Sequence, residues 1–414
     1  MRKIIFSIII CLVAMSAFAQ ENFKFDGSAN IYLMGGDNDY ITSNDREVEK
    51  HKFNADLRLN ASYKASENLE FNTTVAVGNY LNLLTIDPQE KRSCVKPTLY
   101  YLNGKYTDEK IGEIVLGRYG LCVNPYVFQR CCNDDYFEDD LTQDGNYAVL
   151  GANYKNQIKD FSYNLWYGRP QYNVFDEENF YSTNFNLGKL KDFYGVDLGY
   201  DFKVLKVNGL VAQANSDFNS DKANIFGGGV VAPLGEVELS GNYYNQKTDD
   251  FDNAYFANLG LCGEFGKFEG GLEYVYCTED YNAPGDWDIF DNACEGGQKG
   301  VKGVLGYNFN DKIYLELEEH LGENFDKDDL DYTKIDFTWA FDDNNELNIW
   351  HKYNKQKNSL ASDYANRTHI KFSHKFNDNF KGILGYEYAH TTSRIEETAK
   401  YSGNMIFAQL GYSF

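Results

Sequence analysis

The chain has 414 residues, and its 62 acidic residues against 39 basic ones give a formal net charge of −23. Nucleic acid and anionic lipid surfaces are poor partners for so acidic a protein, because like charges repel. Proline is scarce, with 6 residues, whereas tyrosine, phenylalanine and glycine are abundant and evenly spread, which favours one repetitive domain over several linked ones.

The first 19 residues have the pattern of a secretory signal peptide. Two basic residues precede an apolar run over 4–14, and the tripeptide AFA at 17–19 is a small-x-small cleavage site. The apolar run is short for a membrane anchor, and no stop-transfer pattern follows it. We therefore expect the chain to leave the cytoplasm and its mature part, 20–414, to form a single domain.

From residue 21 to the last residue, the chain repeatedly alternates apolar and polar side chains with period two. In the segment 51–64, for example, Leu57 and Leu59 alternate with Arg58 and Asn60. This is the period of a β-strand with one apolar face, and not that of a helix. About 20 strands are predicted, with 16 to 20 as the range, because a few segments give weak patterns. The strands are expected near 21–34, 51–64, 69–82, 97–106, 111–119, 145–155, 160–169, 190–202, 205–214, 223–232, 236–245, 253–265, 268–277, 297–309, 313–321, 331–341, 346–356, 366–376, 380–390 and 403–414.

Short polar turns and longer acidic loops alternate between the strands, which is typical of an up-and-down antiparallel sheet. An aromatic residue precedes most of the short turns, and Tyr412 and Phe414 lie on the apolar side of the last strand. Membrane–water interfaces favour such rings of aromatic residues. Hydrocarbon does not tolerate an open sheet edge, so the last strand is expected to pair with the first. The sequence therefore predicts an all-β transmembrane barrel, because a soluble sandwich, propeller or β-helix explains neither the uniform hairpins nor the terminal aromatic strand.

Three short stretches resemble the Gram-negative outer-membrane porin family, in particular its general diffusion porins. "GRYG" at 117–120 is similar to the motif before the inward-folded third loop of these porins, and "GANYKN" at 151–156 to the motif that closes the next strand. The alternating strand that ends in Phe414 resembles the signal read by the barrel assembly machinery. The loop 120–144 lacks the family's Pro-Glu-Phe-Gly-Gly-Asp core and carries cysteines, and about 20 strands exceed the family's usual number, so a distant lineage is indicated.

The resemblance implies a barrel in the bacterial outer membrane, with short periplasmic turns and long extracellular loops. Its surroundings would be outer-membrane lipids and lipopolysaccharide. The resemblance also implies a homotrimer, no cofactor, and passive diffusion of small hydrophilic solutes and ions through the barrel.

The loop 120–144 is the candidate constriction of the pore by its position. Folded inward, its acidic cluster would focus a negative potential that favours cations. Arg118, Arg58 and Lys52 on neighbouring strands are candidates to face the cluster, although Arg118 shares the strand phase of Leu116 and would point outward without a bulge. A solvated surface loop is the alternative. The acidic cluster consists of Asp134, Asp135, Glu138, Asp139 and Asp140.

Seven cysteines lie in the mature chain, and the oxidising periplasm allows disulfides to form. Cys277 and Cys294 could close the loop 278–296, whereas Cys262 lies within a strand and is expected to be free. Connectivity among the others is open. No C-x-x-C pair is present, which argues against a metal site. The remaining candidates for pairing are Cys94, Cys122, Cys131 and Cys132.

No enzyme is predicted, because His351 and His374 share the strand phase of apolar neighbours and no serine lies at a matching depth. The leading hypothesis is a cation-preferring porin. The first alternative is a substrate-specific channel for sugars, peptides or organic acids, and the second is a structural or adhesive barrel with a plugged lumen. A ladder of lumen aromatics would favour the first alternative, and its inward candidates are Tyr32, Tyr101, Trp166, Tyr244 and Trp350.

Overall fold

The computed structural model describes residues 22–36, 51–78, 97–124, 126–130, 148–170, 190–216, 222–248, 254–281, 297–324, 329–357, 362–392 and 400–414. Within these ranges no helix is long and apolar enough to cross a membrane. The strands are β1 (Phe23–Gly36), β2 (His51–Lys64), β3 (Leu69–Gly78), β4 (Pro97–Asp108), β5 (Gly112–Asn124), β6 (Phe128–Arg130), β7 (Ala148–Ile158), β8 (Phe161–Pro170), β9 (Leu190–Asp201), β10 (Lys206–Ser216), β11 (Lys222–Leu234), β12 (Val237–Lys247), β13 (Ala254–Phe265), β14 (Phe268–Cys277), β15 (Gln298–Asn310), β16 (Ile313–Asn324), β17 (Asp329–Ala340), β18 (Asn345–Lys357), β19 (Ser362–Asn377), β20 (Phe380–Thr392) and β21 (Lys400–Ser413).

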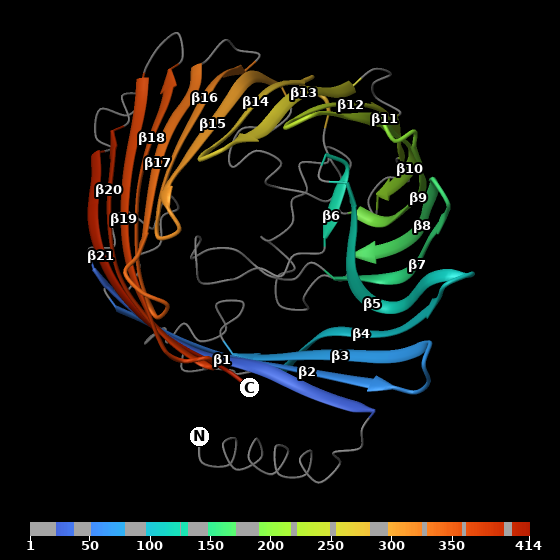
Figure 1. The fold of residues 1–414 in the computed structure, drawn as a ribbon, viewed down its shortest axis with the longest axis horizontal. Coiled ribbons are helices and arrows are strands. Elements are labelled where there is room, and N and C mark those ends of the chain that lie inside the picture. The colour runs from blue at the N-terminus through green and yellow to red at the C-terminus, as the bar shows by residue number, and fades with distance from the viewer. Residues whose placement is uncertain are drawn as a thin grey trace.

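The strands pair antiparallel with their neighbours in the chain and form a closed ring (Figure 1). β1 and β21 close it, in a register that runs from Ser28 opposite Ser413 to Gly36 opposite Met405. β6 pairs only with β5, so 20 of the 21 strands in the described residues make the wall. The predicted up-and-down barrel of about 20 strands is confirmed.

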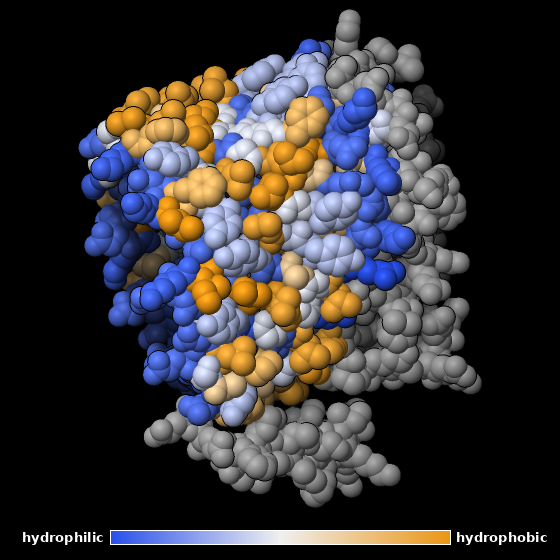
Figure 2. All heavy atoms as spheres, turned by 90° about the vertical axis from the view of Figure 1, so that its right-hand side faces the viewer, coloured by the Kyte–Doolittle hydropathy of each residue, from blue (hydrophilic) through white to orange (hydrophobic). Residues whose placement is uncertain are grey.

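Alternate residues of the wall strands face outward, and most of these are apolar. In β21, Ile406 and Leu410 are 59 % and 45 % exposed, whereas Met405 and Phe407 are buried. Figure 2 shows hydrophobic side chains spread over the outer wall on the side of β7 to β9. Lipid accepts such an apolar face, while the closed ring leaves no unpaired edge. The period-two pattern of the sequence thus encodes the membrane-facing surface.

Short turns join neighbouring strands at one end of the barrel. Gly235 and Gly266 open two of these turns with φ values of +77° and +65°, a left-handed conformation that glycine adopts without strain. Exposed aromatic residues stand on the outer face beside the turns, at the level that an interface favours. They are Tyr63, Phe202, Phe265, Phe309, Phe341 and Phe376.

Candidate functional site

The chain leaves the wall after the first part of β5 and enters the barrel. β5 pairs with β7 only as far as Gly120 opposite Ala148, and beyond that point it pairs with β6. Figure 1 shows β6 inside the ring. We call residues 121–124 and 126–130 the inward segment. They are the start of the predicted constriction loop 120–144, and the structure places them inside the barrel.

Aromatic side chains hold the inward segment against the inner wall. Phe128 is fully buried and stacks on Phe193 of β9, with ring centroids 4.5 Å apart. Tyr126 stacks on Phe256 of β13 at 4.6 Å. Stacked rings in a dry site combine area burial with a favourable ring geometry. The segment is therefore a packed part of the fold and covers the inner face of this side of the wall.

Hydrogen bonds add a second set of anchors. The Asn124 side chain donates to the Tyr244 hydroxyl at 2.8 Å, and Asn258 donates to the Tyr126 hydroxyl at 2.9 Å. The Tyr281 hydroxyl donates to the carbonyl of Tyr126 at 2.9 Å. Burial raises the pKa of Tyr126 to about 12, so its hydroxyl stays protonated at neutral pH. These bonds tie the segment to β12, to β13 and to the residues that follow β14.

Two of the predicted lumen aromatics are buried beneath the inward segment and do not line the open lumen. Trp166 and Tyr244 point inward as expected, but they are only 4 % and 0 % exposed and belong to the apolar cluster under the inward segment. Tyr101 is half-buried, and the side chain of Tyr32 lies outside the described part of the structure. Trp350 lies on the opposite side, away from that cluster.

The inner face of β15 to β20, which we call the ionic sector, carries paired charges and rings in place of an apolar cluster. Arg367 donates two hydrogen bonds to Glu387, at 2.9 and 3.0 Å, and the His369 ring lies 3.2 Å from the same carboxylate. His369 stacks on Trp350 with centroids 5.2 Å apart, and the Arg367 guanidinium lies 5.3 Å from that Trp350 ring. The geometry combines bidentate pairing with cation–π contact.

A second network lies beside the first in the same sector. Lys302 forms a 2.6 Å ion pair with Glu318, which also accepts a hydrogen bond from Tyr332 at 2.5 Å. Lys352 sits over the Tyr332 ring, 4.5 Å from its centroid. Lys334 pairs with Asp336 at 3.6 Å. Each of these cations has a carboxylate or a ring beside it, so the ionic sector is polar without a large local surplus of charge.

The structure describes some of the predicted constriction residues and not others. All five acids of the cluster at 134–140 lie outside the described residues. Arg58 alternates with the outward Leu57 and Leu59, which puts it on the inner face. Lys52 lies in β2 opposite Met34, and its side chain is not described.

The prediction that Arg118 faces the acidic cluster in the lumen is wrong. Arg118 pairs directly with Leu102 on one side and Leu150 on the other, and these leucines are 54 % and 48 % exposed. Directly opposite residues share a face of the sheet, so Arg118 lies on the outer face. The phase set by Leu116 holds, and no bulge intervenes.

The structure tests two of the cysteine predictions. Cys262 is free, as expected. Cys277 is a free, buried thiol near the carbonyls of Thr278 and Tyr281, which differs from the predicted pairing with Cys294. Cys94, Cys131, Cys132 and Cys294 lie outside the described residues, and Cys122 is placed only by its backbone in β5. No group of His, Cys, Asp and Glu in the described ranges is arranged to hold a metal ion.

The end of the chain lies where the sequence predicts it. Tyr412 is 45 % exposed on the outer face of β21, and its ring stacks on that of Phe414 at 6.0 Å. The Phe414 ring also lies 5.8 Å from that of Phe25 in β1. The aromatic terminus therefore spans the seam between the first and last strands.

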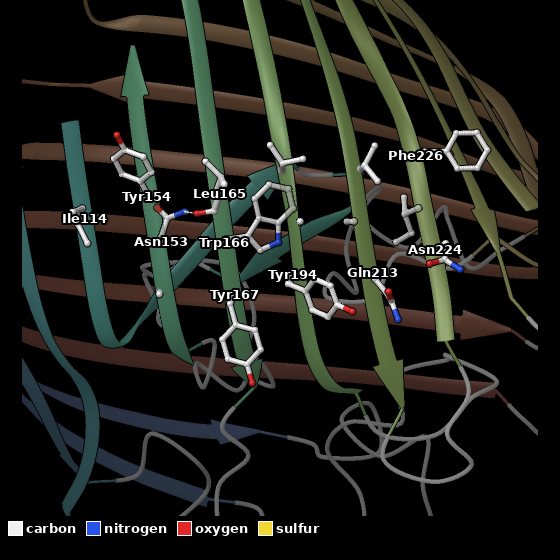
Figure 3. Close-up of a pocket in the computed structure, with 16 residues that line it drawn as sticks. Ile114, Asn153, Tyr154, Leu165, Trp166, Tyr167, Tyr194, Gln213, Asn224 and Phe226 are labelled. Carbon is white, nitrogen blue, oxygen red and sulfur yellow. Dashed lines mark hydrogen bonds between the residues drawn. The ribbon is translucent and has the colours of Figure 1, made fainter. Parts of the chain in front are cut away.

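A groove of about 570 Å³ crosses β7 to β11 on the outer face (Figure 3). Leu165, Tyr167, Tyr194 and Phe226 line it from three of these strands, and all four are exposed on the lipid side of the wall. Trp166 also borders the groove, although its side chain is buried on the inner side of the wall. The groove is thus a feature of the membrane-facing surface and not of the pore.

No model of a known protein family matches the chain, and no curated protein matches it. Solved structures do match. OccK3 (OpdO) of Pseudomonas aeruginosa is similar with a TM-score of 0.56 and 12 % identity, over 95 % of this chain and 96 % of that one. The outer membrane protein opdK of the same organism has a TM-score of 0.54 and 10 % identity, over 95 % and 99 % of the two chains. OccK5 (OpdH), also from that organism, has a TM-score of 0.50 and 12 % identity over the same shares.

At these identities the likeness shows the fold, which is a distant, porin-like outer-membrane barrel. The exposed apolar band and the closed edge require a membrane around the wall. The bacterial outer membrane is therefore the location of this chain.

Proposed function

We propose that the chain is an outer-membrane porin through which small hydrophilic solutes and ions diffuse passively, with a preference for cations. The observation that carries the proposal is the closed wall of 20 strands with a polar, charged inner face over β15 to β20. A barrel of this strand number is too wide for side chains to fill, so it encloses water. The inward segment narrows the lumen from one side.

The cation preference rests on charge. The chain carries 62 acidic residues against 39 basic ones, and five acids fall within seven residues of the loop 120–144. Lys302, Lys334 and Arg367 on the inner wall are each paired with a carboxylate and offset little of this charge. Acids in a water-filled pore attract cations and repel anions.

The proposal extends to the surroundings of the barrel. We propose lipid and lipopolysaccharide contacts around the apolar band, assembly by the barrel assembly machinery, and a homotrimer as the resemblance to porins implies. No cofactor and no catalytic step are part of the proposal.

A substrate-specific channel is the second candidate, and the ionic sector favours it. Rings and cations alternate there over neighbouring strands, with Lys352 on Tyr332 and Arg367 on Trp350. Such a surface contacts a solute by several weak interactions in turn. Conductance that one solute blocks would favour this candidate over general diffusion.

Planar-bilayer recording of the refolded full chain tests the proposal. We expect large, ohmic steps and a reversal potential on the cation side in a salt gradient. A barrel that inserts but conducts no current would overturn the proposal and favour the structural or adhesive alternative.

A further inference from the structure

The outer face of β5 to β11 carries a row of charged and polar side chains at the end of the strands opposite the short turns. Arg118 and Arg169 lie directly on either side of Leu150, which is 48 % exposed. Directly opposite residues share a face of the sheet, so both arginines are on the lipid side. Across β9 to β11 the row continues one residue beyond the pair of Gly168 and Phe193. We call it the outer polar row, and its charged and amide members are Arg118, Arg169, Asp192, Asn215 and Lys222.

The outer polar row carries a surplus of positive charge, although the whole chain has a formal net charge of −23. Its three cations stand against one carboxylate, that of Asp192. On β15 to β18 the outer face at the same end has no such surplus, because it pairs Lys299 with Glu323 at 2.9 Å and sets Lys355 beside two aspartates. A cation on the lipid side is unfavourable in hydrocarbon and favourable beside anionic headgroups. The two sides of this rim therefore suit different neighbours.

Two further rows cross the same strands below the outer polar row and line the groove of about 570 Å³. The nearer row ends in two phenol hydroxyls and two amides, and Figure 3 shows its side chains side by side on four neighbouring strands. The farther row is apolar throughout. Successive rows are two residues apart, which is about 7 Å along a strand. The nearer row consists of Tyr167, Tyr194, Gln213 and Asn224, and the farther row of Leu165, Val196, Val211 and Phe226.

The order of the three rows matches an amphiphile with an anionic head. The chemistry changes from cationic, through hydroxyl and amide, to hydrocarbon within about 13 Å. A guanidinium binds a phosphate through two parallel hydrogen bonds, and it stays charged at physiological pH. A plain hydrocarbon would not use the cations, and a second barrel that presented the same face would set cation against cation. A phosphorylated lipid uses all three rows.

We propose that the outer face of β5 to β11 binds one lipopolysaccharide molecule. Its phosphate groups pair with Arg118, Arg169 and Lys222, its hydroxyl and carbonyl groups meet the tyrosines and amides of the nearer row, and an acyl chain fills the groove. The resemblance to porins puts this end of the strands in the outer leaflet, where lipopolysaccharide is the phosphorylated lipid. The site rests on the lipopolysaccharide contacts of the proposed function and gives them a definite place on the wall.

Native mass spectrometry of the refolded full chain in detergent tests the site, with bisphosphorylated lipid A as the probe. Dephosphorylated lipid A and phosphatidylglycerol are the comparison lipids, and we expect lipid A to bind more tightly than either. Arg118→Gln and Arg169→Gln should each weaken its binding about fivefold, the effect of one cation lost beside an anionic lipid. Lys299→Gln and Lys355→Gln remove the same charge elsewhere on the outer rim and should change nothing.

Val211→Trp tests the groove separately from the cations. Val211 is 61 % exposed and lines the groove, so the larger side chain should occupy the space of the acyl chain and weaken the binding of lipid A. Sedimentation in detergent measures the oligomeric state of the same variant. A changed oligomeric state would overturn the proposal and assign the groove to a second copy of the chain.

Circular dichroism of each variant shows whether the barrel has formed, so lost binding is not confused with lost folding. Equal binding of lipid A by the parent and the arginine variants would overturn the proposal, and so would phosphatidylglycerol that binds as tightly as lipid A. A barrel that conducts but binds no lipid A refutes this site alone. A silent barrel that binds lipid A refutes the porin and keeps the site.

Discussion

The backbones of Phe414 and Gly27 exchange two hydrogen bonds: Phe414 N donates to Gly27 O at 3.0 Å, and Gly27 N donates to Phe414 O at 3.1 Å. This pair continues the β1–β21 ladder to the last residue of the chain. Gly27 is also required sterically, because a Cβ atom there would lie 2.8 Å from the Phe414 ring and 2.4 Å from the Arg58 carbonyl. The seam of the barrel is thus built around the terminal aromatic residue.

Deleting Phe414 should weaken the seam. The deletion removes both backbone hydrogen bonds, at about 1 kcal/mol each, and the ring contacts with Phe25 and Tyr412. Phe414→Ala keeps the backbone bonds and should have a smaller effect. Urea unfolding of the refolded barrel, followed by tryptophan fluorescence, measures both. An identical midpoint for deletion and parent would contradict the role given to this residue.

Phe128→Ala should loosen the inward segment. Truncating a fully buried phenylalanine costs about 3–5 kcal/mol, and here the cost falls on the contact with Phe193. We expect larger and noisier single-channel conductance, because the segment leaves the wall more often. Phe226→Ala removes a ring of the same size from the outer face and should leave conductance unchanged. Unaltered conductance in Phe128→Ala would show that the segment does not limit the pore.

Charge reversal of the acidic cluster should change ion selectivity. Replacing its five acids by lysine should move the reversal potential toward the anion side in a salt gradient, because the local potential changes sign. The matched control reverses five acids on the short turns, at the opposite end of the strands. If selectivity moves equally in both, the cluster is no constriction and only total charge matters. The control acids are Glu109, Asp160, Asp311, Asp343 and Asp378.

Glu387→Gln should destabilise the ionic sector. Glu387 is 3 % exposed and accepts from Arg367 and contacts His369, so the substitution leaves a half-buried guanidinium without its counter-charge. Removing one partner of a fully buried pair costs about 3–5 kcal/mol, which is the upper limit here because the Arg367 side chain reaches solvent. Glu323→Gln breaks the exposed pair with Lys299 and should cost less than about 1 kcal/mol. Urea midpoints compare the two, and equal losses would contradict the burial argument.

Asp342 gives the short turn between β17 and β18 a pH dependence. Hydrogen bonds from the Asn345 side chain and from the backbone N–H groups of Asn344 and Asn345 lower the pKa of this carboxyl. A lowered pKa means that the stabilisation is present above the ordinary carboxyl range and is lost as the pH falls below about 4. Asp342→Asn should therefore reduce the difference in unfolding midpoint between pH 7 and pH 3. An unchanged difference would show that the turn does not contribute.

The wall of the barrel could be predicted from sequence because its physics is local. Alternation along each strand, as in the run from Arg367 to Phe376, states which residues meet lipid and which face inward. The same alternation gave the correct outward faces for His351 and His374, which lie beside Thr368 and Asn345. For Arg118 the phase of Leu116 in the sequence already indicates the outer face.

The interior could not be predicted to the same depth, because it depends on which strands face one another and on what enters the lumen. Trp166 and Tyr244 point inward as predicted, yet the inward segment covers them. β6 was missed, since three residues carry no periodic signal. The inward positions of Arg367 and Glu387 are visible in the alternation, but their ion pair depends on the register of β19 and β20.

The inward segment makes the lumen of the barrel asymmetric. On one side of the described inner wall the inward segment packs on stacked rings, and the other side carries ion pairs. The space left inside the wall is consequently off-centre and lies between the inward segment and the ionic sector. A charged solute would meet the carboxylates and cations of the ionic sector during its passage, because the rings on the opposite side are covered by the inward segment. Such a barrel would orient solutes before it selects them by size.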